Sequence, residues 1–181
     1  MQSMAPVVLI MRDILLLRRG PQDLPYSTQL LAAVAVAGVA VQALACAILL
    51  DVSALLVLFS ACVSVSLTLL ALNLLLGMRK LRNRFVQSAT ALVTSNLLFT
   101  IINIPALLIL PTKPTSPEQM PLLALLLAPL VLACEIWQIA VSAHILRHTL
   151  DIPTWMGVAI VLLWVFIAVV LTALSGGPAL V

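Results

Sequence analysis

Residues 121–153 read PLLALLLAPLVLACEIWQIAVSAHILRHTLDIP, and this stretch decides the fold class of the chain. Residues 122–133 consist of Leu, Ala and Val apart from Pro129, and the far end of the stretch is polar. A lone acidic residue, Glu135, stands in the middle of the stretch. A run of about 20 apolar residues is long enough to cross a bilayer as a helix. The stretch therefore predicts a membrane-spanning helix that carries a carboxyl group near the bilayer centre.

The composition extends this prediction to the whole chain. Hydrophobic residues make up 64% of the 181 residues and charged residues only 8%, whereas soluble domains contain about 45–50% and about 25%. So few charges cannot cover a water-facing surface. The net charge of +3 is not accompanied by a basic face with interleaved aromatic residues, so nucleic acid is not an expected partner. Cys46, Cys62 and Cys134 lie in apolar blocks without a CxxC pair, and we interpret them as buried, inert thiols.

The apolar blocks predict an all-α membrane protein with five spans behind a short N-terminal segment, residues 1–26. Within that segment, residues 5–19 are expected to form a helix in the membrane interface, because Arg12 and Arg19 are seven residues apart and share one face. Ser27 suits the N-cap of the first span. The expected spans, which make up a transmembrane domain over 27–181, are about 27–49, 52–77, 85–110, 122–146 and 153–174.

The basic residues predict the orientation of these spans. Cytoplasmic loops carry an excess of Lys and Arg. With the N-terminus inside, only Lys113 of the nine Lys and Arg residues lies outside, and the C-terminus is then also outside. Few Lys residues and much Ala, Leu and Val indicate a GC-rich bacterial genome, so we expect the bacterial inner membrane.

Glu135 is the sharpest candidate for function. A charged side chain at the bilayer centre costs about 2.5–3.5 kcal/mol, and no Lys or Arg stands at that depth in another span. The carboxyl group is therefore expected to be protonated or to face a polar cavity. Asn96, at the midpoint of the third span, is its first candidate partner. The remaining members of this intramembrane polar site are Gln42, Asn103, Gln138 and Ser142.

Two interpretations of this polar site remain open. In the first, Glu135 is a proton or cation site lined by the amide and hydroxyl side chains. In the second, a neutral hydrogen bond between Glu135 and an asparagine fixes helix packing, a kind of contact that averages about 0.6 kcal/mol in bilayers.

The polar foot of the fourth span and the basic loop before the third offer further candidates. His144 and His148 are four residues apart and leave one helix face together, so with Asp151 they form a weak metal candidate. No second ligand cluster completes that site, so we expect no metal. An interfacial cap that meets lipid phosphate is the alternative. The candidate contacts for anionic lipid headgroups are Arg79, Lys80, Arg82, Arg84, Arg147 and His148.

The segments LLLRRGPQDLPYS and IWQIAVSAHILRHTLDIP and the closing apolar span resemble the bacterial branch of the Yip (Ypt-interacting protein) family. The resemblance covers most of the chain. It implies a five-span helical bundle with an inside N-terminus, an outside C-terminus and no known catalytic centre. Eukaryotic members act in vesicle trafficking and bind small GTPases. Their long hydrophilic N-terminal region and Asp-Leu-Tyr-Gly-Pro motif have no counterpart here, so GTPase binding is not carried over.

The sequence contains no HExxH, GxSxG or P-loop motif, so we expect no enzyme and no cofactor. The leading hypothesis is a scaffold or subunit of a membrane complex, or a protein that organises lipid locally. Its expected partners are the lipid bilayer and another integral membrane protein or a second copy of the chain. The alternatives are a small proton-linked carrier or channel subunit, or a lipid scramblase, that uses Glu135.

Overall fold

The computed structural model describes residues 5–49, 54–109 and 122–174, and these form helices joined by short turns, without a strand in those ranges. The all-helical class is therefore confirmed. The helix of the predicted third span ends at Leu107, three residues before its predicted end. The loop that holds Lys113 and the C-terminal residues 175–181 lie outside the described residues. The helices are α1 (Ala5–Leu15), η1 (Pro21–Asp23), α2 (Thr28–Leu49), α3 (Ala54–Met78), η2 (Arg82–Arg84), α4 (Phe85–Leu107), α5 (Leu122–Leu150) and α6 (Thr154–Leu174).

Four of these helices, α2 to α5, have the length and hydropathy needed to cross a bilayer. The remaining long helix, α6, is also apolar, and its stretch Thr154–Val170 is shorter than the other four. The helices thus fit a multi-pass integral membrane protein.

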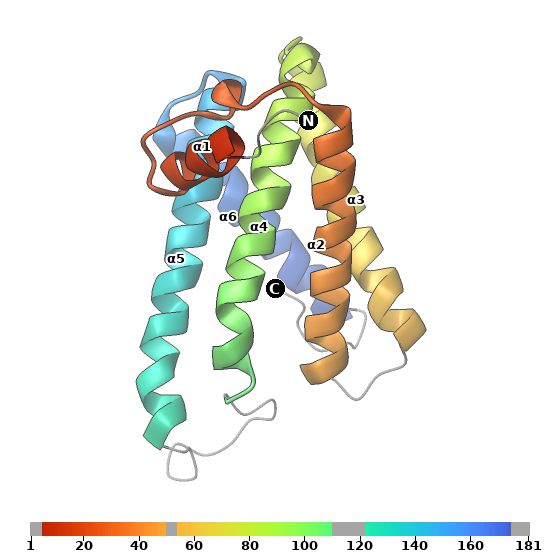
Figure 1. Cartoon of the computed structure of the whole chain (residues 1–181), viewed down its shortest axis with the longest axis vertical. Helices are drawn as coiled ribbons and strands as arrows, with labels where there is room; N and C mark the ends of the chain where they lie inside the picture. The colour runs from red at the N-terminus through yellow and green to blue at the C-terminus, as the bar shows by residue number, and fades with distance from the viewer. Residues whose placement is uncertain (1–4, 50–53, 110–121, 175–181) are drawn as a thin grey trace.

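The long helices run alternately up and down, and α4 is the central helix (Figure 1). It packs most closely against α2 and α5 and more lightly against α3, while α6 packs against α5. Buried residues make up 50% of the apolar window of α4, against 17% or less in the other three candidate spans. Polar residues on α4 therefore face other helices, where an unpartnered polar group would be costly.

The start of α6 lies very close to α5. A Cβ atom built on Gly157 would lie 2.7 Å from the carbonyl oxygen of Ala143, which is a backbone atom that cannot move aside easily. Small residues at such contacts let the backbones of membrane helices approach each other. Gly157 is thus a packing residue that the sequence analysis did not single out.

The N-terminal cap of α2 agrees with the sequence-based prediction. The backbone N–H of Leu30 donates a hydrogen bond of 3.1 Å to Ser27 Oγ. This bond satisfies one of the free N–H groups in the first turn of the helix. Ser27 is therefore confirmed as the N-cap.

The first helix is shorter than predicted, because α1 ends at Leu15 and not at Arg19. Leu17 has a φ of 60°, which is the left-handed conformation that closes helices. The N–H groups of Leu17 and Arg18 then bond to the carbonyls of Ile14 and Asp13 at 2.9 and 2.8 Å. The left-handed residue stops the helix before Gly20 and Pro21, a pair that is typical of turns.

The two arginines that were expected to share one helix face converge on one carboxylate. Arg12 and Arg19 contact the two oxygens of Asp13 at 3.0 and 3.3 Å. Asp13 therefore neutralises part of the positive charge of this segment.

Residues 5–24, which we call the N-terminal strap, lie across α4 and α5 at one end of the bundle (Figure 1). Trp137 Nε1 on α5 donates to the carbonyl oxygen of Leu15 at 3.0 Å. His144 Nε2, also on α5, lies 3.0 Å from the carbonyl oxygen of Arg19. Gln87 Nε2 on α4 donates to Leu24 O at 2.6 Å and to Gln22 O at 3.1 Å. The strap is thus fixed by side chains of the bundle that bind its backbone.

Candidate functional site

Polar side chains join α4 to α5 at four levels along their shared length. We call this set the α4–α5 seam. Six of its eight members lie on two antiparallel helices, so residues early in α4 meet residues late in α5, and Arg84 and Asp151 directly flank the two helices. The four pairs are Arg84–Asp151, Ser88–Thr149, Asn96–Gln138 and Asn103–Glu135.

The pair farthest along the seam from Arg84–Asp151 contains the carboxyl group of Glu135. Asn103 Nδ2 donates a hydrogen bond of 2.8 Å to Glu135 Oε1. Asn103 is buried and Glu135 is half-buried. A direct bond of this length between side chains on two helices fixes how the helices pack, because either group alone would face an apolar medium.

The identity of this partner corrects the sequence-based expectation, which named Asn96. Helix α5 has 29 residues and α4 has 23. The pairs at Arg84 and Ser88 align the start of α4 with the end of α5, so the extra length of α5 extends past the other end of α4. The midpoints of the two helices therefore do not meet, and Glu135 lies beside Asn103.

Asn96 belongs to the next pair along the seam. Gln138 Nε2 donates to Asn96 Oδ1 at 3.4 Å, a longer and weaker contact than the bond at Glu135. Glu135 and Gln138 are three residues apart and lie on one side of α5. The rings of Phe99 and Trp137 pack edge to face nearby, with centroids 5.7 Å apart. Apolar and polar contacts thus alternate between the two helices.

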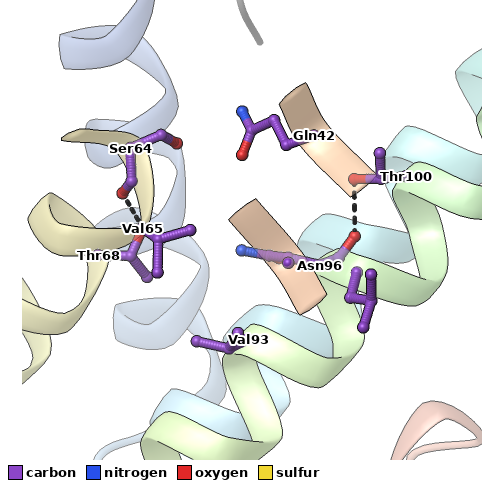
Figure 2. Close-up of a pocket in the computed structure, with 9 residues that line it drawn as sticks. Gln42, Ser64, Val65, Thr68, Val93, Asn96 and Thr100 are labelled. Carbon is purple, nitrogen blue, oxygen red and sulfur yellow. Dashed lines mark hydrogen bonds between the residues drawn. The ribbon is translucent and has the colours of Figure 1, made fainter. Parts of the chain in front are cut away.

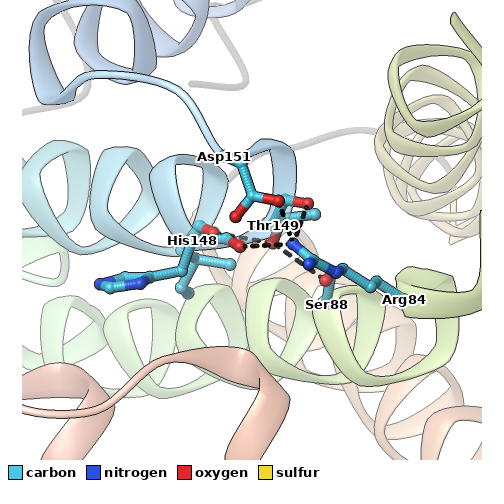
Figure 3. A network of polar contacts seen from close by, with 6 residues as sticks. Arg84, Ser88, His148, Thr149 and Asp151 are labelled. Atoms are coloured by element: carbon cyan, nitrogen blue, oxygen red, sulfur yellow. Dashed lines mark hydrogen bonds and ion pairs between the residues drawn. The ribbon is translucent and has the colours of Figure 1, made fainter. Parts of the chain in front are cut away.

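The outer two pairs form one network at the end of the bundle that carries the strap (Figure 3). Arg84 Nη1 donates to Asp151 Oδ2 at 2.8 Å, and it reaches the carbonyls of His148 and Thr149 at 3.2 and 3.4 Å. These carbonyls belong to the last turn of α5, where no further helical N–H is available. Arg84 therefore caps α5 from the neighbouring helix.

Below this cap, two buried hydroxyl groups bond to each other. Thr149 Oγ1 lies 2.9 Å from Ser88 Oγ, and it is also 2.7 Å from the carbonyl oxygen of Ile145. Both side chains are at most 1% exposed. This pair is not evident from the sequence, because single Ser and Thr residues are common in membrane helices and their partners are set by helix register.

A second polar region lies on the other side of α4, between α2, α3 and α4 (Figure 2). It is a partly open cavity of about 40 Å³. Asn96 lines it, although the same side chain is bonded to Gln138 of the seam. We call this region the α2–α3–α4 cavity, and its lining residues are Gly38, Gln42, Ser64, Val65, Thr68, Val93, Asn96, Leu97 and Thr100.

The predicted intramembrane polar residues are therefore distributed over two linked regions. Asn103, Glu135 and Gln138 belong to the seam, Gln42 to the cavity, and Asn96 to both. Ser142, which was grouped with them, makes no side-chain hydrogen bond within the described part of the chain.

The predicted headgroup contacts also separate into two sets. Arg84 is occupied by α5, and His148 is half-buried. Arg79, Lys80, Arg82 and Arg147 are exposed at the same end of the bundle as the strap. These four side chains remain accessible to an anionic surface.

The histidine pair is close but lacks its third metal ligand. The rings of His144 and His148 have centroids 4.5 Å apart. Asp151 is bonded to Arg84, and His144 Nε2 contacts the backbone of the strap. Over residues 5–49, 54–109 and 122–174, no three His, Cys, Asp or Glu side chains cluster closely enough to bind a metal ion.

The cysteines differ in one respect from the sequence-based interpretation. All three are free, but Cys62 is exposed on α3 and Cys46 and Cys134 are only half-buried. The expectation of buried thiols is therefore wrong for Cys62, because that side of α3 has no neighbouring helix against it.

The fold and the seam together define a helical, multi-pass type of membrane protein whose central helix is joined to its neighbour by paired polar side chains. No protein-family model, curated protein or solved structure matches the chain.

Proposed function

We propose that this chain is a non-enzymatic integral membrane protein that serves as a scaffold or subunit of a membrane complex, or organises lipid locally. In this proposal α2 to α6 are five spans of the bacterial inner membrane. The N-terminal strap lies on the cytoplasmic side and the C-terminus outside. The partners are lipid and another integral membrane protein or a second copy of the chain.

The observation that carries the proposal is the internal pairing of the seam. Glu135, the side chain with the best claim to chemistry, is bonded to Asn103 at 2.8 Å. Arg84, the charge nearest to the start of α4, is bonded to Asp151 and to helix carbonyls. Groups that bind one another in this way stabilise one arrangement of helices. A rigid bundle with apolar outer faces on α2, α3 and α5 suits a structural role.

The distribution of positive charge supports the proposed orientation. Each Lys and Arg in the described residues lies on the strap, on the turn between α3 and α4, or in the last turn of α5. These elements share one end of the bundle (Figure 1). The positive-inside rule assigns that end to the cytoplasm. Membership of the Yip family stays a prediction, and the order of the helices is compatible with it.

A second candidate function is a proton-linked carrier or channel subunit that uses Glu135. One observation favours it: Asn96 contacts the seam on one side and the α2–α3–α4 cavity on the other. Lipid scrambling is a weaker candidate, because none of the basic residues at the end of the bundle lines that cavity.

The experiment that tests the proposal compares wild type with Glu135→Gln in proteoliposomes. Proton flux and lipid scrambling are measured on each protein, and thermal stability is measured on the same preparations. Glutamine keeps the oxygen that accepts the hydrogen bond from Asn103 but cannot bind and release a proton as a carboxyl group does. A structural Glu135 therefore predicts similar stability for both proteins and no flux above that of empty vesicles.

Flux by the wild-type protein that disappears in a stably folded Glu135→Gln variant would overturn the structural role and establish the carrier. Scrambling that is equal in both proteins would instead move the function to the lipid-facing surface. Asn103→Asp is a matched variant, because it changes the hydrogen-bond partner of Glu135 on α4 and leaves the glutamate itself unchanged.

A further inference from the structure

The proposed structural role rests on the seam and does not account for the α2–α3–α4 cavity. It lies among candidate membrane spans, where unfilled polar space is unfavourable. A cavity needs about 10–15 Å³ to hold one water molecule. The observed volume of about 40 Å³ is therefore enough for a few water molecules and too small for a lipid headgroup.

Two threonines give the cavity hydrogen-bond acceptors. Thr68 Oγ1 donates its proton to the carbonyl oxygen of Ser64 at 3.0 Å, and Thr100 Oγ1 donates to that of Asn96 at 2.9 Å (Figure 2). Each hydroxyl has only one proton, and that proton is already used. The two oxygens can therefore accept a further hydrogen bond but cannot donate one. An occupant of the cavity must therefore be able to donate hydrogen bonds.

Two amides give the cavity donors. Gln42 makes no side-chain hydrogen bond within the described part of the chain, and its amide points into the space between α2, α3 and α4 (Figure 2). The Nδ2 group of Asn96 is directed to the same space, while its Oδ1 accepts from Gln138. An occupant must therefore also accept hydrogen bonds.

The lining contains no charged side chain. An ion would lose its hydration without gaining an opposite charge, which is costly in an apolar medium. Water is neutral, both donates and accepts, and forms about three bonds when buried. It meets every requirement of this lining.

We propose that the α2–α3–α4 cavity is a site for ordered water inside the bundle. This water binds the amide of Gln42 and the hydroxyls of Thr68 and Thr100. It also reaches Asn96, so the seam is hydrated at the Asn96–Gln138 pair from the side opposite to α5.

Two serines on α3 provide a matched test with water as the probe. Ser64 is half-buried and lines the cavity, whereas Ser66 is exposed on the outer side of the same helix and does not line it. Each is changed to Cys in a background in which Cys46, Cys62 and Cys134 are Ala. The proteins are reconstituted in lipid vesicles and transferred to D₂O, and exchange of the single thiol proton is followed by the infrared S–H band. Serine and cysteine differ by one atom, so both variants are expected to fold.

We expect the Ser64→Cys thiol to exchange at least about tenfold faster than the Ser66→Cys thiol, because exchange requires transient ionisation in contact with water. Adding Thr100→Leu fills the cavity from α4 and should return the rate to that of Ser66→Cys. Equal rates for the two thiols would overturn the proposal. A Ser64→Cys rate that is insensitive to Thr100→Leu would do so as well. If Ser64→Cys does not fold, Thr68→Cys gives the same comparison one turn further along α3.

Discussion

Polar side chains on the two sides of α4 differ in how they are hydrogen-bonded. On the α5 side, the seam pairs each polar group with a partner on the other helix, as in the 2.8 Å bond between Asn103 and Glu135. On the α2 and α3 side, the hydroxyls of Thr68 and Thr100 bond only within their own helices, and Gln42 has no side-chain partner in the described residues. The seam therefore holds helices together, while the cavity leaves its polar groups available to water.

The difference follows from whether polar side chains on facing helices reach one another, because α4 packs at least as closely against α2 as against α5. A side chain that reaches its partner directly excludes water and fixes the distance between two helices. Where the groups do not reach each other, a space remains, and a polar space inside a membrane protein fills with water. Stability measurements can separate the two cases, because only the paired groups lose a partner when one side chain is changed.

The largest effect is expected for Asn103→Leu. The substitution removes the donor to Glu135 and leaves the carboxyl group facing apolar atoms, which should lower the free energy of unfolding by about 1–2 kcal/mol. Glu135→Gln keeps the acceptor oxygen and should change it by less than about 0.5 kcal/mol. Reversible unfolding in mixed micelles measures both values. Equal losses in the two variants would mean that the bond depends on the carboxyl group itself and not only on an acceptor oxygen at that position.

A smaller effect is expected at the outer end of the seam, for Arg84→Met. Methionine fills similar space but cannot bond to Asp151 or to the carbonyls of His148 and Thr149. The expected loss is about 1 kcal/mol, because the last turn of α5 loses both its cap and a favourable positive charge. The ion pair is partly exposed, so the loss should shrink at high salt.

Arg82→Met is the matched control for Arg84→Met, because Arg82 is exposed in the same short turn and has no acidic partner within the described residues. It should leave the free energy of unfolding unchanged within about 0.5 kcal/mol. A salt-independent loss in Arg84→Met would contradict the ion pair and leave only the hydrogen bonds to the backbone.

The sequence predicts the helices better than it predicts the seam. Apolar blocks and Ser27 give the ends of α2 within one residue of the prediction, because length, hydropathy and capping are local properties. The pairing of Glu135 with Asn103 instead depends on how far α5 extends past α4. That offset is set by contacts at the opposite end of the seam, such as Ser88–Thr149, which no local pattern in the sequence reveals.

The early end of α1 is a second case in which tertiary structure prevails over the local signal. Gly20 and Pro21 predict the end of the helix, but Leu17 adopts the left-handed conformation first. A left-handed conformation costs about 1–2 kcal/mol for a residue other than glycine. The bond from Trp137 to the carbonyl oxygen of Leu15 helps to offset this cost, and it joins groups that are far apart in the sequence.

The same substitution on the two sides of α4 gives the finest test of the comparison. Thr68 and Thr149 each donate a hydrogen bond to the carbonyl four residues earlier, but only Thr149 also contacts a side chain of another helix, Ser88. Changing Thr to Val keeps the shape and removes the hydroxyl group. Thr149→Val should therefore lower the free energy of unfolding by about 0.6–1 kcal/mol, and Thr68→Val by less than about 0.3 kcal/mol.

A difference of about 0.5 kcal/mol between these variants is resolvable by unfolding both in the same micelles on the same day, with Ser88→Ala as a third variant. Thr149→Val in the Ser88→Ala background should cost less than it does alone, because the partner is already gone. Additive losses would mean that the two hydroxyls, although 2.9 Å apart, do not stabilise each other. A loss at Thr68 as large as that at Thr149 would mean that water bound in the cavity stabilises the packing of α2, α3 and α4 as strongly as the seam stabilises that of α4 and α5.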